Sequence, residues 1–499
     1  MYLIGIDIGT TNTKAVAFTR DGKVLASANA TYSPFTDTEG RHELDPGELF
    51  GAVIQVLGEV LTHTSTRQGL AGISFSAAMH SLLAVDREGV PLTKAITWAD
   101  LRSHSYAEAL RGTEAGKRIY RQTGTPIHAM SPLCKLLWLR DREPGIFQQA
   151  AKFISIKEYI WWKLFGKYQV DYSIASATGL FDIYAFDWYK ESLERAGIGS
   201  ERLSIPVPST QVETAVTPSL AAVLRLPMGV PFVIGGSDGC LANLGSLAVK
   251  PGETALTIGT SGAIRMTTPA PTYDPRERIF NYILTKDYYI AGGATNNGGG
   301  VVQWFIEHFL GKGAATPEEI QAFAEEAASA PPGSEGLVFL PYLQGERAPV
   351  WDADAKGVLY GIRSIHQQRH FMRAVLEGVS YSLYQIGLSL EETIGPIRHI
   401  YASGGFTRSK TWLQLLADIF NRKVYVTGVA DASAIGAVVL GWYALGMAAS
   451  LEEPLQSFQI AETYEPDPAR HLLYRKNFEI YSVLYDRLKD LEKTKRNAS

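Results

Sequence analysis

Two short turns combine glycine with hydroxyl side chains directly after an apolar run, the first ending at Ile8 and the second at Ile258. Glycine lets the backbone approach a ligand closely, and N–H and O–H donors are what a phosphate needs. One copy alone is typical of an ordinary hairpin. Because the device occurs twice, the sequence predicts two β-hairpins that grip adjacent phosphates of one nucleotide. The predicted contacts are Gly9, Thr10, Thr11, Asn12, Gly259, Thr260 and Ser261.

Two charged residues flank the first turn. Asp7 stands where the second hairpin has Thr257. A carboxylate beside phosphates is a suitable partner for Mg²⁺, through water, because Mg²⁺ keeps much of its hydration shell; a turn-capping aspartate is the simpler alternative. Lys14 is equally suited to a phosphate contact and to a solvated surface.

A third carboxylate, Asp238, lies within the glycine-rich segment 235–239, after the apolar run Phe232–Ile234. This places it at the C-terminal end of a predicted strand, where α/β folds bind ligands. Phosphoryl transfer to an alcohol needs a group that accepts the hydroxyl proton. The sequence therefore predicts Asp238 as a general base, with an Asx-turn aspartate as the alternative.

Two further glycine-rich segments favour nucleotide contacts. Gly404 and Gly405 lie between a predicted strand and the helix beginning near Ser409. They leave room for a flat ligand or for phosphates at a helix N-terminus. The denser segment 292–300 is costly in conformational entropy unless it has a use, so we predict a nucleotide contact at Asn297.

The first half contains clusters suited to a polyhydroxylated substrate, which proteins bind with a few placed polar groups and an aromatic ring. Alternatives stay open, since His80 also suits a satisfied core histidine and the Asp100–Arg102 segment suits a helix cap. The predicted substrate contacts are Ala78, Met79, His80, Trp98, Asp100, Arg102 and Asp171.

Short apolar runs alternate with helical patterns along the chain, which predicts an α/β fold. Runs such as Leu3–Ile8 and Ala71–Phe75 indicate buried strands, and the spacing within Pro46–Leu61 indicates a helix. The repeated hairpin begins each half, so we expect two domains, 1–245 and 246–499.

The composition narrows the class of protein. A net charge of -4 disfavours nucleic acid as a partner. The two cysteines, Cys134 and Cys240, indicate free thiols in a reducing compartment. No secretory signal precedes Asp7, and the uncharged stretch between Asp431 and Glu452 favours a buried helix over a membrane span. We therefore expect a cytoplasmic protein.

Three segments resemble the FGGY family of carbohydrate kinases, within the actin, hexokinase and Hsp70 ATPase superfamily. Gly5–Thr11 resembles its first phosphate motif, Met130–Leu139 its first signature, and Gly357–Ile362 with His370–Glu377 its second. Arg142 departs from the first signature, which usually has Glu, Asn, Gln or His there.

The resemblance implies an α/β chain of two ribonuclease-H-like domains flanking a catalytic cleft, with ATP and Mg²⁺ as cofactors and a homodimer as a compatible assembly. The nucleotide would lie mostly on the second domain and the sugar mostly on the first. It also implies roles for individual residues: Asp238 as the catalytic base, Asp7 near Mg²⁺, Gly259, Thr260 and Gly405 at ATP, and His80, Asp100 and Arg102 at the sugar.

Within this family, the segments Phe75–Ser81, Ile96–Asp100, Thr123–His128 and Asp171–Gly179 are most similar to gluconate kinases. Xylulokinases share the Met-His pair but usually have Gly-Gln where Ala77 and Ala78 stand. The resemblance thus implies phosphorylation of D-gluconate to 6-phosphogluconate.

Two other readings remain open. One is a different FGGY kinase acting on a neutral pentulose or on glycerol, and the other is an actin- or Hsp70-like ATPase without a sugar. An anionic substrate needs a cation in its pocket. The candidates for that cation are Arg102, Lys135 and Lys157.

Overall fold

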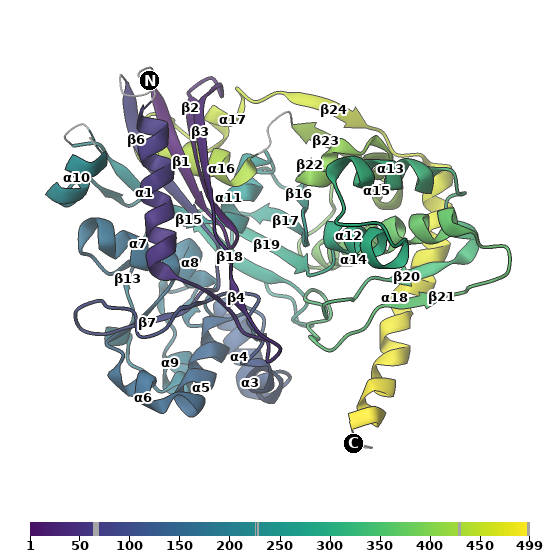
Figure 1. Ribbon diagram of the computed structural model, residues 1–499, viewed down its shortest axis with the longest axis horizontal. Coiled ribbons are helices and arrows are strands. Elements are labelled where there is room, and N and C mark those ends of the chain that lie inside the picture. The colour runs from purple at the N-terminus through teal and green to yellow at the C-terminus, as the bar shows by residue number, and fades with distance from the viewer. Residues whose placement is uncertain (63–68, 225, 227–228, 428–430, 497–499) are drawn as a thin grey trace. The chain divides into compact units, whose positions relative to one another are not determined.

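The computed structural model describes residues 1–62, 69–224, 226, 229–427 and 431–496. Contacts divide the chain into two compact units (Figure 1). Unit 1 comprises Met1–Val249, Thr267–Ile290 and Asp431–Gln459, and unit 2 comprises Lys250–Met266, Ala291–Ala430 and Ile460–Ser499. Each unit thus draws on separate parts of the sequence, and the domain division after residue 245 stays a prediction.

Unit 1 is built on a six-stranded sheet with the order β14-β15-β6-β1-β2-β3. The strands β1, β6 and β15 run parallel to one another, whereas β2, β3 and β14 pair in antiparallel fashion. The C-terminal ends of three neighbouring strands therefore meet at one edge. The bounds are β1 Tyr2–Ile8, β2 Asn12–Thr19, β3 Val24–Thr31, β6 Leu70–Ala77, β14 Val212–Glu213 and β15 Phe232–Ser237.

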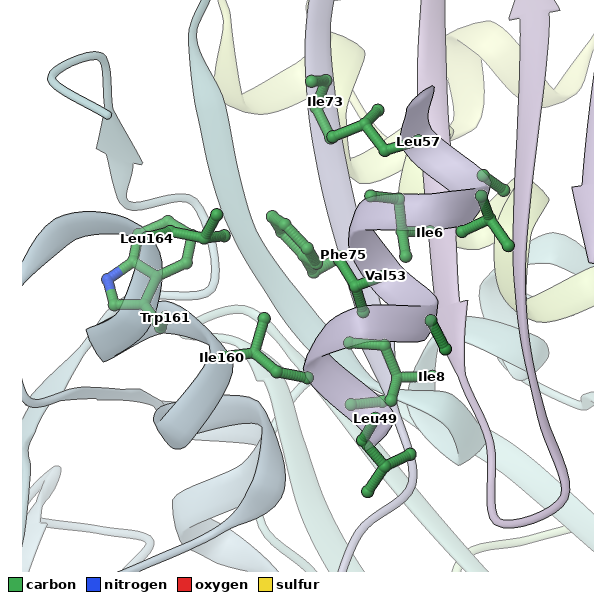
Figure 2. Packing of buried hydrophobic residues seen from close by; sticks show 14 of the residues in the cluster. Ile6, Ile8, Leu49, Val53, Leu57, Ile73, Phe75, Ile160, Trp161 and Leu164 are labelled. Carbon is green, nitrogen blue, oxygen red and sulfur yellow. The ribbon is translucent and has the colours of Figure 1, made fainter. Parts of the chain in front are cut away.

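The core of unit 1 lies between this sheet and the helices α1 (Pro46–Thr62) and α7 (Ile156–Phe165). Figure 2 shows Ile6 and Ile8 of β1 beside Leu49 and Val53 of α1, with Trp161 of α7 near Phe75. Successive strand residues point to opposite faces, so isoleucines at alternate positions give β1 one continuous apolar face. This packing fixes the positions of β1 and β6, and with them the residues that follow their C-terminal ends.

The helix α16 (Ala432–Ala444) contacts β1 and β6 and is almost entirely buried, which explains its lack of charge. A Cβ atom added at Gly5 would lie 2.5 Å from the Ala434 carbonyl oxygen, so glycine permits this close approach. The predicted buried helix is confirmed. Of the helices in the described ranges, none has the length and apolarity needed to cross a bilayer.

The remaining elements of unit 1 are short and mostly surround these layers. They are β4 Phe35–Thr36, β5 His42–Leu44, β7 Leu83–Val85, β8 Ala95–Ile96, α3 His104–Leu110, α4 Glu114–Thr123, α5 Pro132–Arg142, α6 Pro144–Gln149, β9 Lys152–Ile154, β10 Gln169–Asp171, α8 Tyr172–Ser176, β11 Phe181–Asp182, β12 Asp187–Trp188, α9 Lys190–Ala196, β13 Ile205–Val207, α10 Pro218–Leu224, α11 Asp238–Gly245, β18 Phe280–Thr285 and α17 Glu452–Leu455.

Unit 2 contains the strand order β17-β16-β22-β23-β24, in which β16, β22 and β23 are parallel. The helices α14 and α15 pack against each other, and α15 contacts β23. Two strands, β17 Gly262–Thr268 and β19 Tyr288–Thr295, have residues in both units. The other elements of unit 2 are β16 Glu253–Ile258, α12 Gly299–Trp304, a π-helical turn Phe305–Phe309, α13 Pro317–Ala328, β20 Val338–Leu340, β21 Val358–Tyr360, α14 Gln368–Thr393, β22 His399–Ser403, α15 Lys410–Phe420, β23 Lys423–Thr427, β24 Ile460–Tyr464 and α18 Pro468–Arg496.

The predicted repeat is present as two antiparallel hairpins of the same form. Residues 9–11 join β1 to β2, and residues 259–261 join β16 to β17. The Gly9 N–H donates to the carbonyl of Asn12, the first residue of β2, and the Gly259 N–H donates to the carbonyl of Ser261, the last residue of its turn. Both distances are 2.9 Å. The first hairpin belongs to unit 1 and the second to unit 2.

Candidate active site

Three predicted features follow the three parallel strands of unit 1 at one sheet edge. The first hairpin turn follows β1, the segment Ala78–His80 follows β6, and Asp238 follows β15. The Ala78 N–H donates to the Ile8 carbonyl at 2.8 Å, which ties the second of these to the end of β1. The fold therefore brings the predicted base, phosphate turn and sugar segment into one region, as expected for ligands at strand C-termini.

Asp238 is the first residue of α11, and its side chain is partly exposed. Its Oδ1 accepts the Gly239 N–H at 2.7 Å, and the preceding Ser237 caps the helix by accepting the Cys240 N–H. A carboxylate held at the start of a helix, with a surface to solvent, can accept a proton from a bound hydroxyl.

The approach to Asp238 is a tight bulge in β15. The pairing of β15 with β6 shifts register between Val233 and Gly236, and Gly235 has a φ of 72°. A Cβ atom at Gly235 would lie 1.7 Å from the Phe75 carbonyl oxygen. Only glycine fits this position. The bulge bends β15 just before Asp238 and so changes the direction in which the following residues lie.

An acidic group lies around Asp7. Its Oδ1 accepts the Ser76 hydroxyl at 2.6 Å. Burial raises the pKa of Asp7 to about 7, helped by the nearby carboxylates of Asp238 and Asp431 and opposed by Ser76 and Lys14. The Lys14 ammonium pairs with Asp431 at 2.6 Å. The group therefore carries more negative charge than its one lysine balances.

This charge excess suits a divalent cation. Within the described residues, no three His, Cys, Asp or Glu side chains are arranged to enclose a metal by themselves. Mg²⁺ is commonly held by one or two carboxylates together with water and substrate phosphates. Asp7, beside the predicted phosphate turn, fits that kind of site. Its neighbour Asp431 is not among the residues predicted from the sequence.

The predicted sugar segment is held in an unusual conformation. His80 has a φ of 68°, which is rare for a residue other than glycine. Its Nδ1 lies 2.7 Å from the Ala177 carbonyl and its Nε2 lies 3.5 Å from the Tyr282 hydroxyl. Strained residues of this kind concentrate at functional sites. Of the neighbours, Met79 is partly exposed and Ala78 is buried.

The second predicted sugar segment contains an ion-pair network. The Arg102 guanidinium donates to both Asp100 oxygens and to Glu43, and it lies over the Trp138 ring at 4.4 Å. Asp100 is 1% exposed, whereas Trp98 is partly exposed. Two carboxylates thus balance the Arg102 charge, so this residue is not a free cation for a substrate carboxylate.

The two buried lysines are likewise engaged. Lys135 donates to the His80 and Ile96 carbonyls, and burial lowers its pKa to about 7. Lys157 pairs with Asp171 at 2.8 Å. None of the three cations considered from the sequence is available without rearrangement.

Asp171, predicted to contact the substrate, is bonded to partners within unit 1. Its side chain is 1% exposed, Oδ2 accepts from Lys157, and Oδ1 accepts the Ile174 N–H as the N-cap of α8. Both oxygens thus have partners inside the protein, and its contact with the substrate stays a prediction.

Unit 2 contains a pocket of about 280 Å³ beside the second hairpin. It brings together three predicted nucleotide contacts, Gly259, Thr260 and Gly405. Gly404 lies against the end of β16, since a Cβ atom there would be 2.4 Å from the Ile258 carbonyl. Ser261 is partly exposed and does not line the pocket. The other lining residues are Ile258, Gly299, Gln303, Pro317, Ile320, Gln321, Phe406, Arg408, Ser409 and Trp412.

The glycine-rich segment 292–300 supports this hairpin through its backbone. The Gly299 N–H donates to the Gly259 carbonyl at 2.7 Å, and the Gly300 N–H donates to the Thr260 carbonyl at 3.0 Å. A Cβ atom at Gly299 would lie 2.8 Å from the Gly259 oxygen. The glycines are thus used for close packing against the hairpin turn.

Asn297, predicted to contact the nucleotide, is buried and bonded to a neighbouring loop. Its side chain is 1% exposed, and its amide donates to the Gly345 carbonyl and to Glu346. Glu346 accepts the Thr295 hydroxyl at 2.6 Å as well. Asn297 therefore anchors the segment, and its contact with a nucleotide stays a prediction.

The free energy of unfolding is expected to fall as the pH rises from about 4.5 to about 7 because of Glu346, whose pKa burial raises to about 7. In that window the folded state holds a proton that the unfolded state has released, so folding weakens as the pH rises. In Glu346→Gln, the free energy of unfolding measured by urea denaturation should therefore fall less steeply with pH over this range.

The exposed Glu318→Gln serves as the control and should leave the slope unchanged. An unaltered slope in Glu346→Gln would show that Glu346 does not titrate in this window.

Comparison with known proteins agrees with these features. The family profile for the FGGY family of carbohydrate kinases, N-terminal domain, matches residues 2–245, and that for the C-terminal domain matches residues 254–445. A gluconokinase from Bacillus licheniformis is 42% identical over 486 residues, covering 96% of this chain and 94% of the relative.

Two further relatives match over the same extent of the chain, at lower identity. A xylulose kinase from Staphylococcus epidermidis (strain ATCC 12228 / FDA PCI 1200) is 32% identical, covering 98% of this chain and 97% of its own. The crystal structure of gluconate kinase from Lactobacillus acidophilus superposes with a TM-score of 0.93 at 36% identity, with 98% of both chains covered.

Fold and site together define a two-domain α/β sugar phosphotransferase with the actin- and hexokinase-like ATPase architecture. The chain belongs to the FGGY family of carbohydrate kinases. The family and fold expected from the sequence are confirmed, and ATP follows from this membership as the phosphoryl donor.

Proposed function

We propose that the protein transfers the γ-phosphoryl group of ATP to D-gluconate, giving 6-phospho-D-gluconate. The observation that carries this proposal is the 42% identity to a gluconokinase across nearly the whole of both chains. The xylulose kinase from Staphylococcus epidermidis is more distant in sequence, at 32% identity.

In the proposed reaction, Asp238 accepts the proton of the gluconate hydroxyl as its oxygen attacks the γ-phosphorus of ATP. The bond from that phosphorus to the β–γ bridging oxygen breaks, and ADP leaves. Its place after β15, beside the segment that carries His80, supports this role. Met79, Trp98 and the ion-paired Arg102 are proposed to contact the substrate. Asp171 and Asn297 are proposed to support the site through their neighbours.

Asp7 is the proposed partner of Mg²⁺, and its acidic surroundings support a cation there. Mg²⁺, when bound, offsets negative charge on the phosphate oxygens. The hydrogen bond from Ser76 holds the Asp7 carboxylate in place. Lys14 pairs with Asp431 and so limits the repulsion between the Asp431 and Asp7 carboxylates.

The proposed nucleotide contacts are the residues of the two hairpin turns together with Gly404 and Gly405. The pocket beside Gly259, Thr260 and Gly405 in unit 2 supports this assignment. That both hairpins hold one nucleotide stays a prediction from the repeat.

Thr10→Val and Thr260→Val are each expected to weaken ATP binding by roughly tenfold, the scale of a lost hydrogen bond to a charged group. Isothermal titration with a non-hydrolysable ATP analogue measures the change. Thr214→Val, at an exposed position, is the control. Unchanged affinity in both hairpin variants would contradict the two-hairpin account.

ADP release measured against a panel of sugars tests the substrate. Release with gluconate is the expected result. Release with D-xylulose or glycerol but not gluconate would favour another kinase of the family, and release without any sugar, stimulated by a protein, would favour an actin- or Hsp70-like ATPase.

We also propose a cytoplasmic location and a homodimer as the assembly. A reducing location agrees with two buried free cysteines, Cys134 and Cys240.

A further inference from the structure

We propose that Lys157 and Asp171 form a buried positioning pair that fixes the turn carrying Asp238. The inference rests on the proposed function, because it concerns the residue that acts as general base there. The sequence predicted both residues at the substrate, Asp171 as a contact and Lys157 as a candidate cation, whereas we propose a positioning role for the two.

The contacts all lie within unit 1. The Lys157 ammonium, from α7, donates to Asp171 Oδ2 at 2.8 Å and to the Gly236 carbonyl at 3.0 Å. The side chains are 3% and 1% exposed. Gly236 precedes Asp238 by two residues, so one ammonium group binds both the carboxylate and the turn of the proposed base.

A second link joins the same segment to the same turn. The Ser173 hydroxyl donates to Ser237 Oγ at 2.9 Å and accepts the Ser237 N–H at 3.0 Å. Ser237 in turn caps the helix that begins at Asp238. Asp171 caps the helix that contains Ser173, so the ion pair and the serine pair hold one short helix against the turn.

A buried ion pair is a costly way to fill space, because an apolar pair of similar volume is often as stable or more stable. Burial lowers the pKa of Lys157, and Asp171 opposes this shift. An apolar pair would leave the Gly236 carbonyl without the donor that Lys157 supplies. The Lys157 ammonium therefore has a role that an apolar side chain cannot fill, because it donates a hydrogen bond to the Gly236 carbonyl.

Lys157→Met tests the proposal in the full-length protein. We expect kcat to fall by at least about tenfold, equivalent to ~1.4 kcal/mol in the barrier. The KM values for gluconate and ATP should stay within about twofold, since both side chains are buried and bonded to partners inside unit 1. A KM for gluconate that rises while kcat holds would place the pair at the sugar and overturn the proposal.

The double variant Lys157→Met/Asp171→Asn separates positioning from charge balance. Removing both charges should recover stability lost by the single variant, because no unpaired charge stays buried. The value of kcat should nevertheless stay low, since Gly236 still lacks its donor. Recovery of wild-type kcat in the double variant would overturn the proposal.

Two other variants complete the design. Ser173→Ala removes the second link without changing charge and should also lower kcat at constant KM, which keeps the test decisive if Lys157→Met fails to fold. Lys167→Met breaks an exposed pair with Glu213 and should behave as wild type.

Failure of this inference is distinguishable from failure of the proposed function. Slow turnover in Asp238→Asn with normal turnover in Lys157→Met and Ser173→Ala would overturn only the positioning pair. Normal turnover in Asp238→Asn would overturn the assignment of the base itself.

Discussion

Asp238→Asn is expected to lower kcat by at least about a hundredfold, which is the scale of a lost general base. The ATP affinity should stay close to that of the wild type. Asparagine keeps the size of the side chain and its acceptance of the Gly239 N–H, but it cannot take a proton from the acceptor. Steady-state ADP release and nucleotide titration measure the two quantities.

The exposed Asp287→Asn is the matched control, since it removes a carboxylate away from the sheet edge. Turnover in Asp238→Asn within a few-fold of that control would remove Asp238 from the role of base.

Gly235→Ala is expected to destabilise the protein by more than about 2 kcal/mol and to abolish turnover. The left-handed backbone at this position already disfavours alanine. In addition, its Cβ atom would meet the Phe75 carbonyl at 1.7 Å, so β15 must move away from β6. Urea denaturation gives the free energy of unfolding, and ADP release gives turnover.

Gly112→Ala separates the two causes. Gly112 has the same φ of 72° but has no atom within 4 Å of an added Cβ. It should therefore show the conformational cost alone and keep its turnover. Equal losses of stability in the two variants would contradict the steric account.

The sequence predicted those parts of the site that depend on local pattern. The apolar run Leu3–Ile8 became β1, and the repeated glycine and hydroxyl turns became hairpins with the same length of turn. The position of Asp238 after a strand was also readable, because strand, glycines and carboxylate are adjacent in the chain.

Partners far apart in the chain could not be predicted. Lys14 and Asp431 form an ion pair although 417 positions separate them. Their meeting depends on α16 packing against β1. A single sequence contains no spacing that reports such a contact.

Burial is a second property that residue type alone does not report. Asp171 and Asn297 have side chains suited to ligands, yet the fold turns both inward and occupies their polar atoms. The glycines around Asn297 predicted a ligand contact from their type alone. In the structure they pack closely against the turn of the second hairpin. Composition alone cannot distinguish these uses of glycine.

Identification of the phosphorylated product tests the central claim most directly. After incubation with ATP, Mg²⁺ and D-gluconate, phosphorus NMR should show a phosphate ester coupled to the protons on carbon 6, formed in equal amount with ADP. Inorganic phosphate beside unmodified gluconate, or an ester formed only when D-xylulose replaces gluconate, would contradict it.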